Sequence, residues 1–136
     1  MATKSEINGW IESARKKVDR YQQTIDSCNK QIARLEPVYR KLGDIKADFH
    51  SARKSTEEVF DRKDSWRGDK HTSFRQAGDA LDGTCGEYYQ RLDAAQDAVN
   101  KKIGELRAKK RELVPLVGDL LAQVAEWRVD IENALN

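Results

Sequence analysis

The spacing of apolar residues in the first quarter of the chain limits the possible folds more than any other feature. They recur in steps that alternate between four and three residues, at Ile7, Ile11, Ala14, Val18, Tyr21, Ile25, Cys28, Ile32 and Leu35. This seven-residue repeat places them along one face of an α-helix and is typical of helices that pack lengthwise on one another. We therefore expect a long helix that begins near residue 4, where Thr3 and Glu6 match a capping box.

The repeat shifts its phase after Leu35. A second three-residue step leads to Val38, and the pattern then resumes at Leu42, Ile45, Phe49, Ala52, Thr56 and Val59. Pro37 lies inside this phase slip, and proline removes a backbone donor and clashes with the preceding turn of a helix. We expect a kink or a short break near residues 34–38.

The second half of the chain carries a similar repeat after Gly68. Its members are Phe74, Ala77, Leu81, Cys85, Tyr88, Leu92, Ala95, Val99, Ile103, Leu106, Leu113, Val117, Leu120, Val124, Trp127, Ile131 and Ala134. Lys110 interrupts the pattern, Gly83 and Gly86 weaken the helix, and we expect Pro115 to bend it. None of these residues is expected to end the second helix, because the apolar pattern continues beyond each of them.

The one strong turn signal lies between the two repeats, in the stretch DSWRGDKHTSF. Gly68 provides the backbone freedom that a chain reversal needs, and the rings of Trp66 and Phe74 can pack across the adjoining helix ends. Since no stretch shows strand alternation, we predict an all-α fold, an elongated antiparallel two-helix hairpin. It forms a single domain over residues 1–136, with arm one at about 4–63, the turn at about 64–69 and arm two at about 70–135.

Trp66, Gly68 and Phe74 resemble the W-x-G turn and downstream aromatic residue of the WXG-hundred (ESAT-six-like) family of type VII secretion. Members of that family are small helical hairpins that form dimers. The motif covers only Trp66 to Phe74, although the architecture covers the whole chain. The chain departs from the family in its greater length. The family's Y-x-x-x-D/E export signal follows the second helix, whereas Tyr89 and Asp93 lie in the middle of arm two.

The extra length is similar to that of the helical partner proteins encoded with LXG-domain toxins in Gram-positive bacteria. This resemblance implies a non-enzymatic targeting factor that binds the helical N-terminal domain of such a toxin for type VIIb export. It also implies a protein that is cytoplasmic before export and secreted without a cleavable signal peptide. Two alternatives remain open. One is a self-dimerising secreted protein without a toxin partner, and the other is a basic coiled-coil adaptor or nucleic-acid-associated protein.

Tyr89 and Asp93 allow a second interpretation. A tyrosine followed four residues later by an aspartate is common on helices, so the pair can serve packing alone. Off-repeat apolar residues point more directly to a binding surface, because exposed apolar stripes mark partner sites. The predicted partner-binding stripe consists of Trp10, Tyr39, Phe60, Leu116, Leu121 and Trp127, with Val114 beside it.

The charge pattern argues against other classes of function. The formal net charge is only +2, with both signs interspersed, which does not favour a nucleic-acid or membrane-surface protein. The locally basic stretch KKIGELRAKKR contains no aromatic residue for base stacking. His50 and His71 are the only histidines and neither lies at ligand spacing, so we expect no metal, no cofactor and no catalysis. We expect Cys28 and Cys85 to be free thiols, and we expect neither a signal peptide nor a transmembrane helix.

Overall fold

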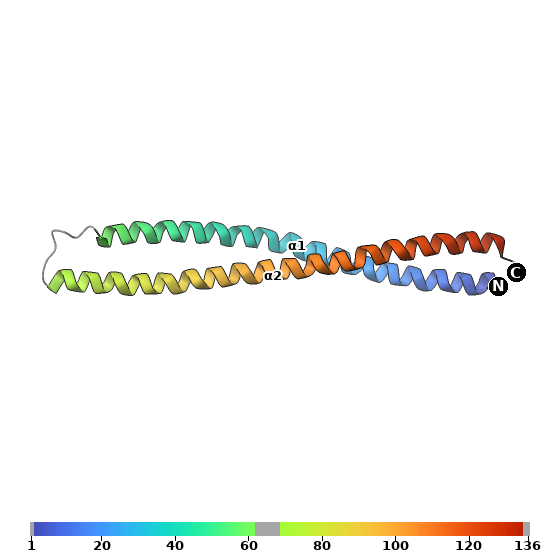
Figure 1. Cartoon of the computed structure of the whole chain (residues 1–136), viewed down its shortest axis with the longest axis horizontal. Helices are drawn as coiled ribbons and strands as arrows, with labels where there is room; N and C mark the ends of the chain where they lie inside the picture. The colour runs from blue at the N-terminus through green and yellow to red at the C-terminus, as the bar shows by residue number, and fades with distance from the viewer. Residues whose placement is uncertain (1, 62–68, 135–136) are drawn as a thin grey trace. The chain divides into compact units, whose positions relative to one another are not determined.

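The computed structural model describes residues 2–61 and 69–134, except for the side chains of residues 59–61 and 69–71. It consists of helix α1 (Lys4–Asp61) and helix α2 (Asp69–Asn133), and the described residues contain no strand (Figure 1). Thr3 caps α1, because its Oγ1 accepts a hydrogen bond of 3.2 Å from the backbone N–H of Glu6. The all-α two-helix hairpin is therefore confirmed, while the predicted turn with Trp66 and Gly68 lies outside the described residues.

Neither proline ends a helix. Pro37 lies inside α1 and Pro115 inside α2, and α2 also continues through Gly83 and Gly86. The predicted short break near residues 34–38 does not occur, and a kink there stays a prediction. An internal proline costs a helix about 3 kcal/mol, and lateral packing on a second helix offsets that cost.

The contacts divide the chain into two units, which we describe separately. Unit 1 combines Met1–Arg34 with Ile103–Asn136, and unit 2 is Leu35–Lys102. Within each unit a segment of α1 packs against an antiparallel segment of α2. The packing face of each helix follows a seven-residue repeat whose two inward positions we call a and d. Position g directly precedes a, and position e directly follows d. In an antiparallel pair the two g rows lie along one flank of the interface and the two e rows along the other.

The core of unit 1 is apolar except at Lys110, which is half-buried at an a position of α2. Its buried hydrophobic residues are Ile7, Ile11, Ala14, Ile25, Cys28, Ile32, Ile103, Leu106, Leu113, Val117 and Val124. They occupy a and d positions of both helices, as the periodicity predicted. Ile7 and Ile11 pack with Val124, and Ile25 packs with Leu113. Each such side chain stabilises the fold by about 1.5–3 kcal/mol through removal of its surface from water.

The seam of unit 2 corrects the sequence prediction for α1. Lys46, Phe49 and Arg53 are half-buried, whereas Val38 and Ile45, which the sequence placed in the seam, are exposed. The repeat of α1 thus keeps one phase through residue 56, and the predicted phase slip is wrong. A search for apolar residues alone passes over Lys46 and Arg53, whose long aliphatic stems can be buried while their charged ends reach a partner.

The same correction applies to α2 within unit 2. Asp82, Tyr89 and Gln96 are half-buried at a positions, whereas Leu81 and Tyr88 beside them are exposed. Ala95, which the sequence also placed in the seam, is exposed as well. Unit 2 therefore has a partly polar seam, and its apolar residues are concentrated at d and at g.

Candidate functional site

Lys46 is the centre of the first polar group in the seam of unit 2. Its Nζ donates hydrogen bonds to Oδ1 of Asp93 at 2.5 Å and to Oε1 of Gln96 at 3.0 Å. Gln96 in turn donates from Nε2 to the backbone carbonyl of Tyr39 at 3.4 Å. The hydrogen bond to Asp93 raises the pKa of Lys46 above its ordinary value. These contacts connect α1 to α2 through Lys46 and Gln96 at a positions, most of which are apolar in unit 1.

Arg53 is the centre of the second polar group. Its Nε donates to Oδ1 of Asp82 at 2.9 Å, and a terminal guanidinium nitrogen donates to the Asp82 backbone carbonyl at 3.5 Å. The same Nε lies 3.6 Å from a carboxylate oxygen of Glu57. The hydrogen bond from Arg53 lowers the pKa of Asp82, and the same bond raises the pKa of Arg53. Both helices therefore contribute an ionised partner to this part of the interface.

Two glycines provide room for these polar groups. A methyl group at Gly43 would lie 3.1 Å from Nε2 of Gln96, and one at Gly86 would lie 3.6 Å from the Arg53 guanidinium. Both glycines occupy e positions, as does Asp93. The e flank of unit 2 is therefore polar and closely approached by charged side chains. Polar groups at a positions are known to select one pairing of helices over others, so we interpret the two groups as fixing how α1 pairs with α2.

The g flank of unit 2 has the opposite character. Four of its apolar side chains are exposed: Val38 by 44%, Ile45 by 37%, Leu81 by 43% and Tyr88 by 48%. The ring of Tyr88 lies 4.9 Å from that of Phe49, measured between centroids, so the flank is continuous with the d positions of the seam. We call this surface the unit 2 stripe. Its described members at g and d are Leu35, Val38, Leu42, Ile45, Phe49, Ala52, Phe74, Leu81, Cys85, Tyr88, Leu92, Ala95 and Val99.

The sequence identified these residues and placed the d members correctly in the seam, but it wrongly placed the g members there as well. Successive d and g positions are separated by three and four residues, as are successive a and d positions. The d–g row and the a–d row therefore match the same periodic pattern. The pairs Lys46–Asp93 and Arg53–Asp82, together with the partial burial of most a residues, show that a and d face inward. That signal is hard to find in the sequence, because the partners lie on different helices.

Two tryptophans form an aromatic pair in unit 1. The ring centroids of Trp10 and Trp127 are 5.8 Å apart and the ring planes are tilted by 48°. Trp10 is exposed at a g position, whereas Trp127 packs against the core at a d position. Hollows of about 380 and 220 Å³ adjoin Trp10, the first also lined by Trp127 and Lys17 and the second by Asp130. The structure thus brings together two residues of the predicted partner-binding stripe.

The remaining residues of that predicted stripe do not form one surface. Leu116 is exposed at a g position of unit 1, and Leu121 is exposed at an e position, on the other flank. Tyr39 belongs to unit 2, where it is exposed at an a position. The side chain of Phe60 lies outside the described residues. Phe74, predicted to close the turn, is half-buried at a g position.

Tyr89 and Asp93, the candidate export signal, both contact α1. The Nζ of Lys46 lies 5.4 Å from the centroid of the Tyr89 ring and donates a hydrogen bond to Asp93. The Tyr89 ring also lies 6.3 Å from that of His50, between centroids. These contacts give both residues a packing role, and their use as an export signal stays a prediction.

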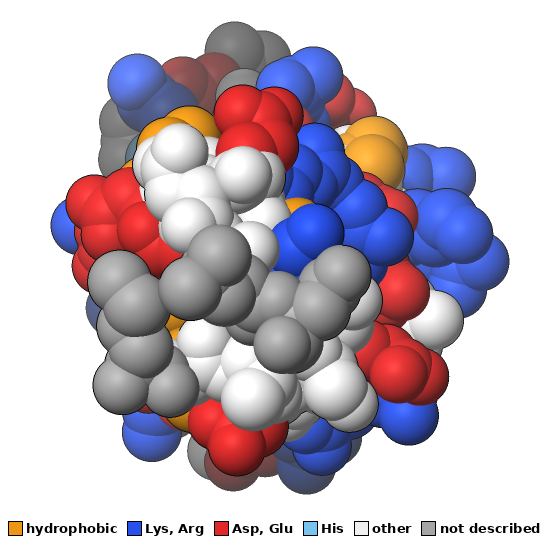
Figure 2. Space-filling view, turned by 90° about the vertical axis from the view of Figure 1, so that its right-hand side faces the viewer, with side chains coloured by type: hydrophobic (Ala, Val, Ile, Leu, Met, Phe, Trp, Pro, Cys, Tyr) orange, Lys and Arg blue, Asp and Glu red, His pale blue; other side chains and the backbone are white. Residues whose placement is uncertain are grey.

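Within the described part of the chain, no group of three His, Cys, Asp or Glu side chains is arranged to hold a metal ion. Neither described helix contains an apolar window long enough to cross a membrane. Both cysteines are free, with Cys28 in unit 1 and Cys85 in unit 2. Viewed from the side of its chain termini, unit 1 shows acidic and basic side chains interspersed, with apolar side chains in small separate patches (Figure 2). Comparison of the chain with protein-family models, curated proteins and solved structures finds no match.

Proposed function

We propose that this protein is a non-enzymatic binding partner that holds an α-helical segment of another protein along the unit 2 stripe. One observation carries the proposal: the seam of unit 2 uses a and d positions, and it leaves an apolar row at g exposed on both helices. Exposed apolar rows of this kind mark partner surfaces. Their spacing fits a helix whose own side chains pack between them, which would extend the two helices into a bundle.

The family resemblance suggests which helix this is. Trp66, Gly68 and Phe74 match the W-x-G pattern of type VII secretion substrates, and two long helices suit the partner proteins of LXG-type toxins. We therefore propose that the stripe binds the helical N-terminal domain of an LXG-type toxin and brings the toxin to a type VIIb secretion system. On this proposal the complex forms in the cytoplasm and leaves the cell without a cleavable signal peptide.

Co-expression with an LXG-type helical domain tests the proposal. The double substitution Ile45→Gln with Leu81→Gln removes two exposed apolar contacts from opposite sides of the stripe. Burial of two half-exposed side chains is worth about 2 kcal/mol, so affinity should fall by about tenfold or more. Val129→Gln is the matched control, because Val129 is exposed by 54% on α2 in unit 1, away from the stripe. Its complex should co-purify as the unchanged protein does.

Two results would contradict the proposal. One is the absence of any complex with helical toxin domains at high protein concentration. The other is a complex that Ile45→Gln with Leu81→Gln leaves intact. If instead the protein forms a homodimer that the same double substitution disrupts, the stripe is a self-association surface and the toxin assignment is wrong. Sedimentation velocity of the free protein distinguishes these results.

A further inference from the structure

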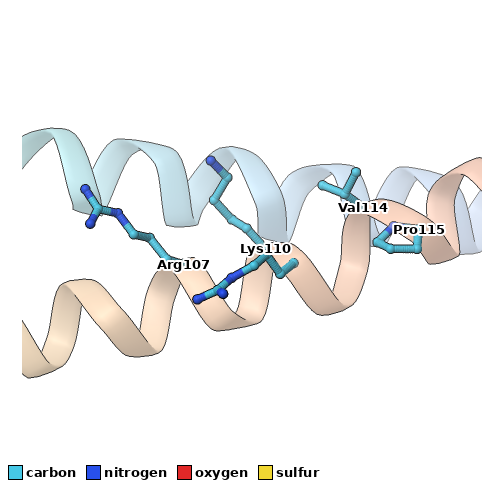
Figure 3. Close-up of a pocket in the computed structure, with 5 residues that line it drawn as sticks. Arg107, Lys110, Val114 and Pro115 are labelled. Atoms are coloured by element: carbon cyan, nitrogen blue, oxygen red, sulfur yellow. The ribbon is translucent and has the colours of Figure 1, made fainter.

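Helix α2 carries a second exposed groove, in unit 1, that differs in character from the unit 2 stripe. It is lined by Arg107, Lys110, Arg111, Val114 and Pro115 and has a volume of about 560 Å³. Figure 3 shows Arg107, Lys110, Val114 and Pro115 following one another along α2. Three cationic side chains thus surround two apolar ones.

The charges of α2 in unit 1 are sorted between two sides of the helix. The acidic residues from Ile103 to Arg128 recur every seven residues, at Glu105, Glu112, Asp119 and Glu126. All four precede a d position, which places them on the side of α2 away from the groove. Glu112 forms an ion pair with Lys109 at 3.9 Å on that side. The a and e positions over the same range include Arg107, Lys110 and Arg128 and no acidic residue.

Apolar side chains extend along this basic side. Val114 is 53% exposed and Leu121, one repeat further, is 52% exposed, both at e positions. The e positions of α1 in unit 1, Arg15, Gln22 and Asn29, add no acidic side chain to this flank. Between the two exposed apolar residues lies Gly118, where an added methyl group would meet no atom within 4 Å. The groove is therefore continuous with an apolar, acid-free strip of α2.

We propose that this basic groove is a second docking site, which binds an acidic amphipathic α-helix of a protein partner. Apolar residues of that helix would cover Val114 and Leu121, while its carboxylates would lie against Lys110 and Arg111. Charge complementarity selects this occupant, because a neutral or basic partner would offer no carboxylate to Lys110 and Arg111. Nucleic acid fits less well, because the exposed apolar side chains of Val114 and Pro115 cannot form hydrogen bonds or ion pairs with a phosphate backbone. In addition, no aromatic side chain lines the groove for base stacking.

The test uses the full-length protein and two synthetic helical peptides about three heptads long. Both carry leucines at a and d, and their flanking residues are all glutamate in one peptide and all lysine in the other. Fluorescence anisotropy at about 0.15 M salt, where the Debye length is about 8 Å, should show binding of the glutamate peptide at least about tenfold tighter than that of the lysine peptide. The double substitution Arg107→Glu with Arg111→Glu should weaken glutamate-peptide binding by about tenfold and strengthen lysine-peptide binding.

A matched control makes the same change of net charge elsewhere in unit 1. Arg20→Glu with Lys30→Glu reverses two exposed cations on α1 that lie outside the groove. It should change glutamate-peptide affinity by less than about threefold, because charges separated by more than a Debye length are screened. Circular dichroism of each variant confirms that the helices remain formed.

Three outcomes would overturn the proposal. The first is equal affinity for the two peptides, and the second is an equal loss in the groove and control variants. The third is a DNA duplex that displaces the glutamate peptide from the groove, which would assign the surface to nucleic acid. The proposal does not depend on the toxin assignment, because the groove substitutions leave the unit 2 stripe unchanged and therefore should not alter the binding of a peptide to that stripe.

Discussion

The two units use the same two helices in different ways. Unit 1 contains every buried hydrophobic residue of the described chain, and its a and d positions are almost entirely apolar. Unit 2 has no buried apolar side chain among its described residues, and it places Lys46 and Arg53 in its seam. Its apolar residues lie instead at d, which faces the other helix, and at g, which faces partly away from it. The packing of α1 on α2 therefore buries the apolar core of unit 1, whereas unit 2 leaves an apolar row exposed that a partner can contact.

This difference separates stability from recognition. Buried apolar side chains contribute most of the folding free energy of a two-helix protein, and those of the described residues are all in unit 1. The ion pairs of unit 2 are partly solvated, with Asp93 52% and Asp82 47% exposed, so each stabilises the fold little. We infer that unit 1 holds the helices together and that unit 2 provides a specific but weakly stabilised pairing beside its binding surface.

The largest expected effect comes from matched core substitutions in the two units. Leu113→Ala in unit 1 should lower the free energy of unfolding by about 3 kcal/mol, because it removes a buried side chain and leaves a cavity. Leu42→Ala in unit 2 should cost about 1 kcal/mol, because Leu42 is only half-buried. Urea denaturation of both variants measures the difference. Equal losses would remove the contrast between the units.

A smaller effect of opposite sign is expected when the seam of unit 2 is made apolar. Lys46→Leu with Gln96→Leu should raise the free energy of unfolding, since well-packed apolar residues often stabilise more than polar groups at an interface. Asp93 remains solvated after the change, so no buried charge is left unpaired. The same variant should show alternative association states in sedimentation velocity, because the polar groups that select the pairing are gone. A loss of stability would show that the polar group itself holds unit 2 together.

The smallest effect is a pH dependence that belongs to unit 2. Arg53 lowers the pKa of Asp82 in the folded chain, so this carboxylate stabilises the fold fully above the ordinary aspartate pKa of about 3.9. The contribution is lost as the pH falls through the lower folded-state value. Asp82→Asn should therefore lower the free energy of unfolding slightly at neutral pH. It should also reduce the loss of that free energy as the pH is lowered into the acid range. Asp79→Asn, which changes an exposed carboxylate on the same helix, provides the control. An identical acid profile for unchanged protein and Asp82→Asn would contradict the pairing.

The sequence was sufficient for the helices and for unit 1, because an apolar repeat that only Lys110 interrupts leaves a single way to pack. It was not sufficient for unit 2, where Val38 and Ile45 form as regular a row with Leu42 and Phe49 as the true seam does. The choice between the two rows depends on Lys46 and Asp93, which are 47 residues apart. A pattern along one helix cannot show a pair formed across two. In the sequence, the basic groove is visible only as the basic stretch KKIGELRAKKR. The separation of basic from acidic side chains on α2 becomes clear only when the structure shows which face of α2 packs on α1.

The most direct measurement is the rate of thiol alkylation at single cysteines in unit 2, in a background with Cys28→Ala and Cys85→Ala. The substitutions Ile45→Cys and Leu81→Cys report on g, Leu42→Cys and Leu92→Cys report on d, and Val129→Cys gives the rate of an exposed site. At low protein concentration the structure predicts that the g cysteines react nearly as fast as Val129→Cys, while the d cysteines react much more slowly. Addition of the helical partner should then slow only the g cysteines to the rate of the d cysteines. If the g cysteines are already as slow as the d cysteines in the free monomer, d and g form the internal seam and unit 2 has no open apolar row.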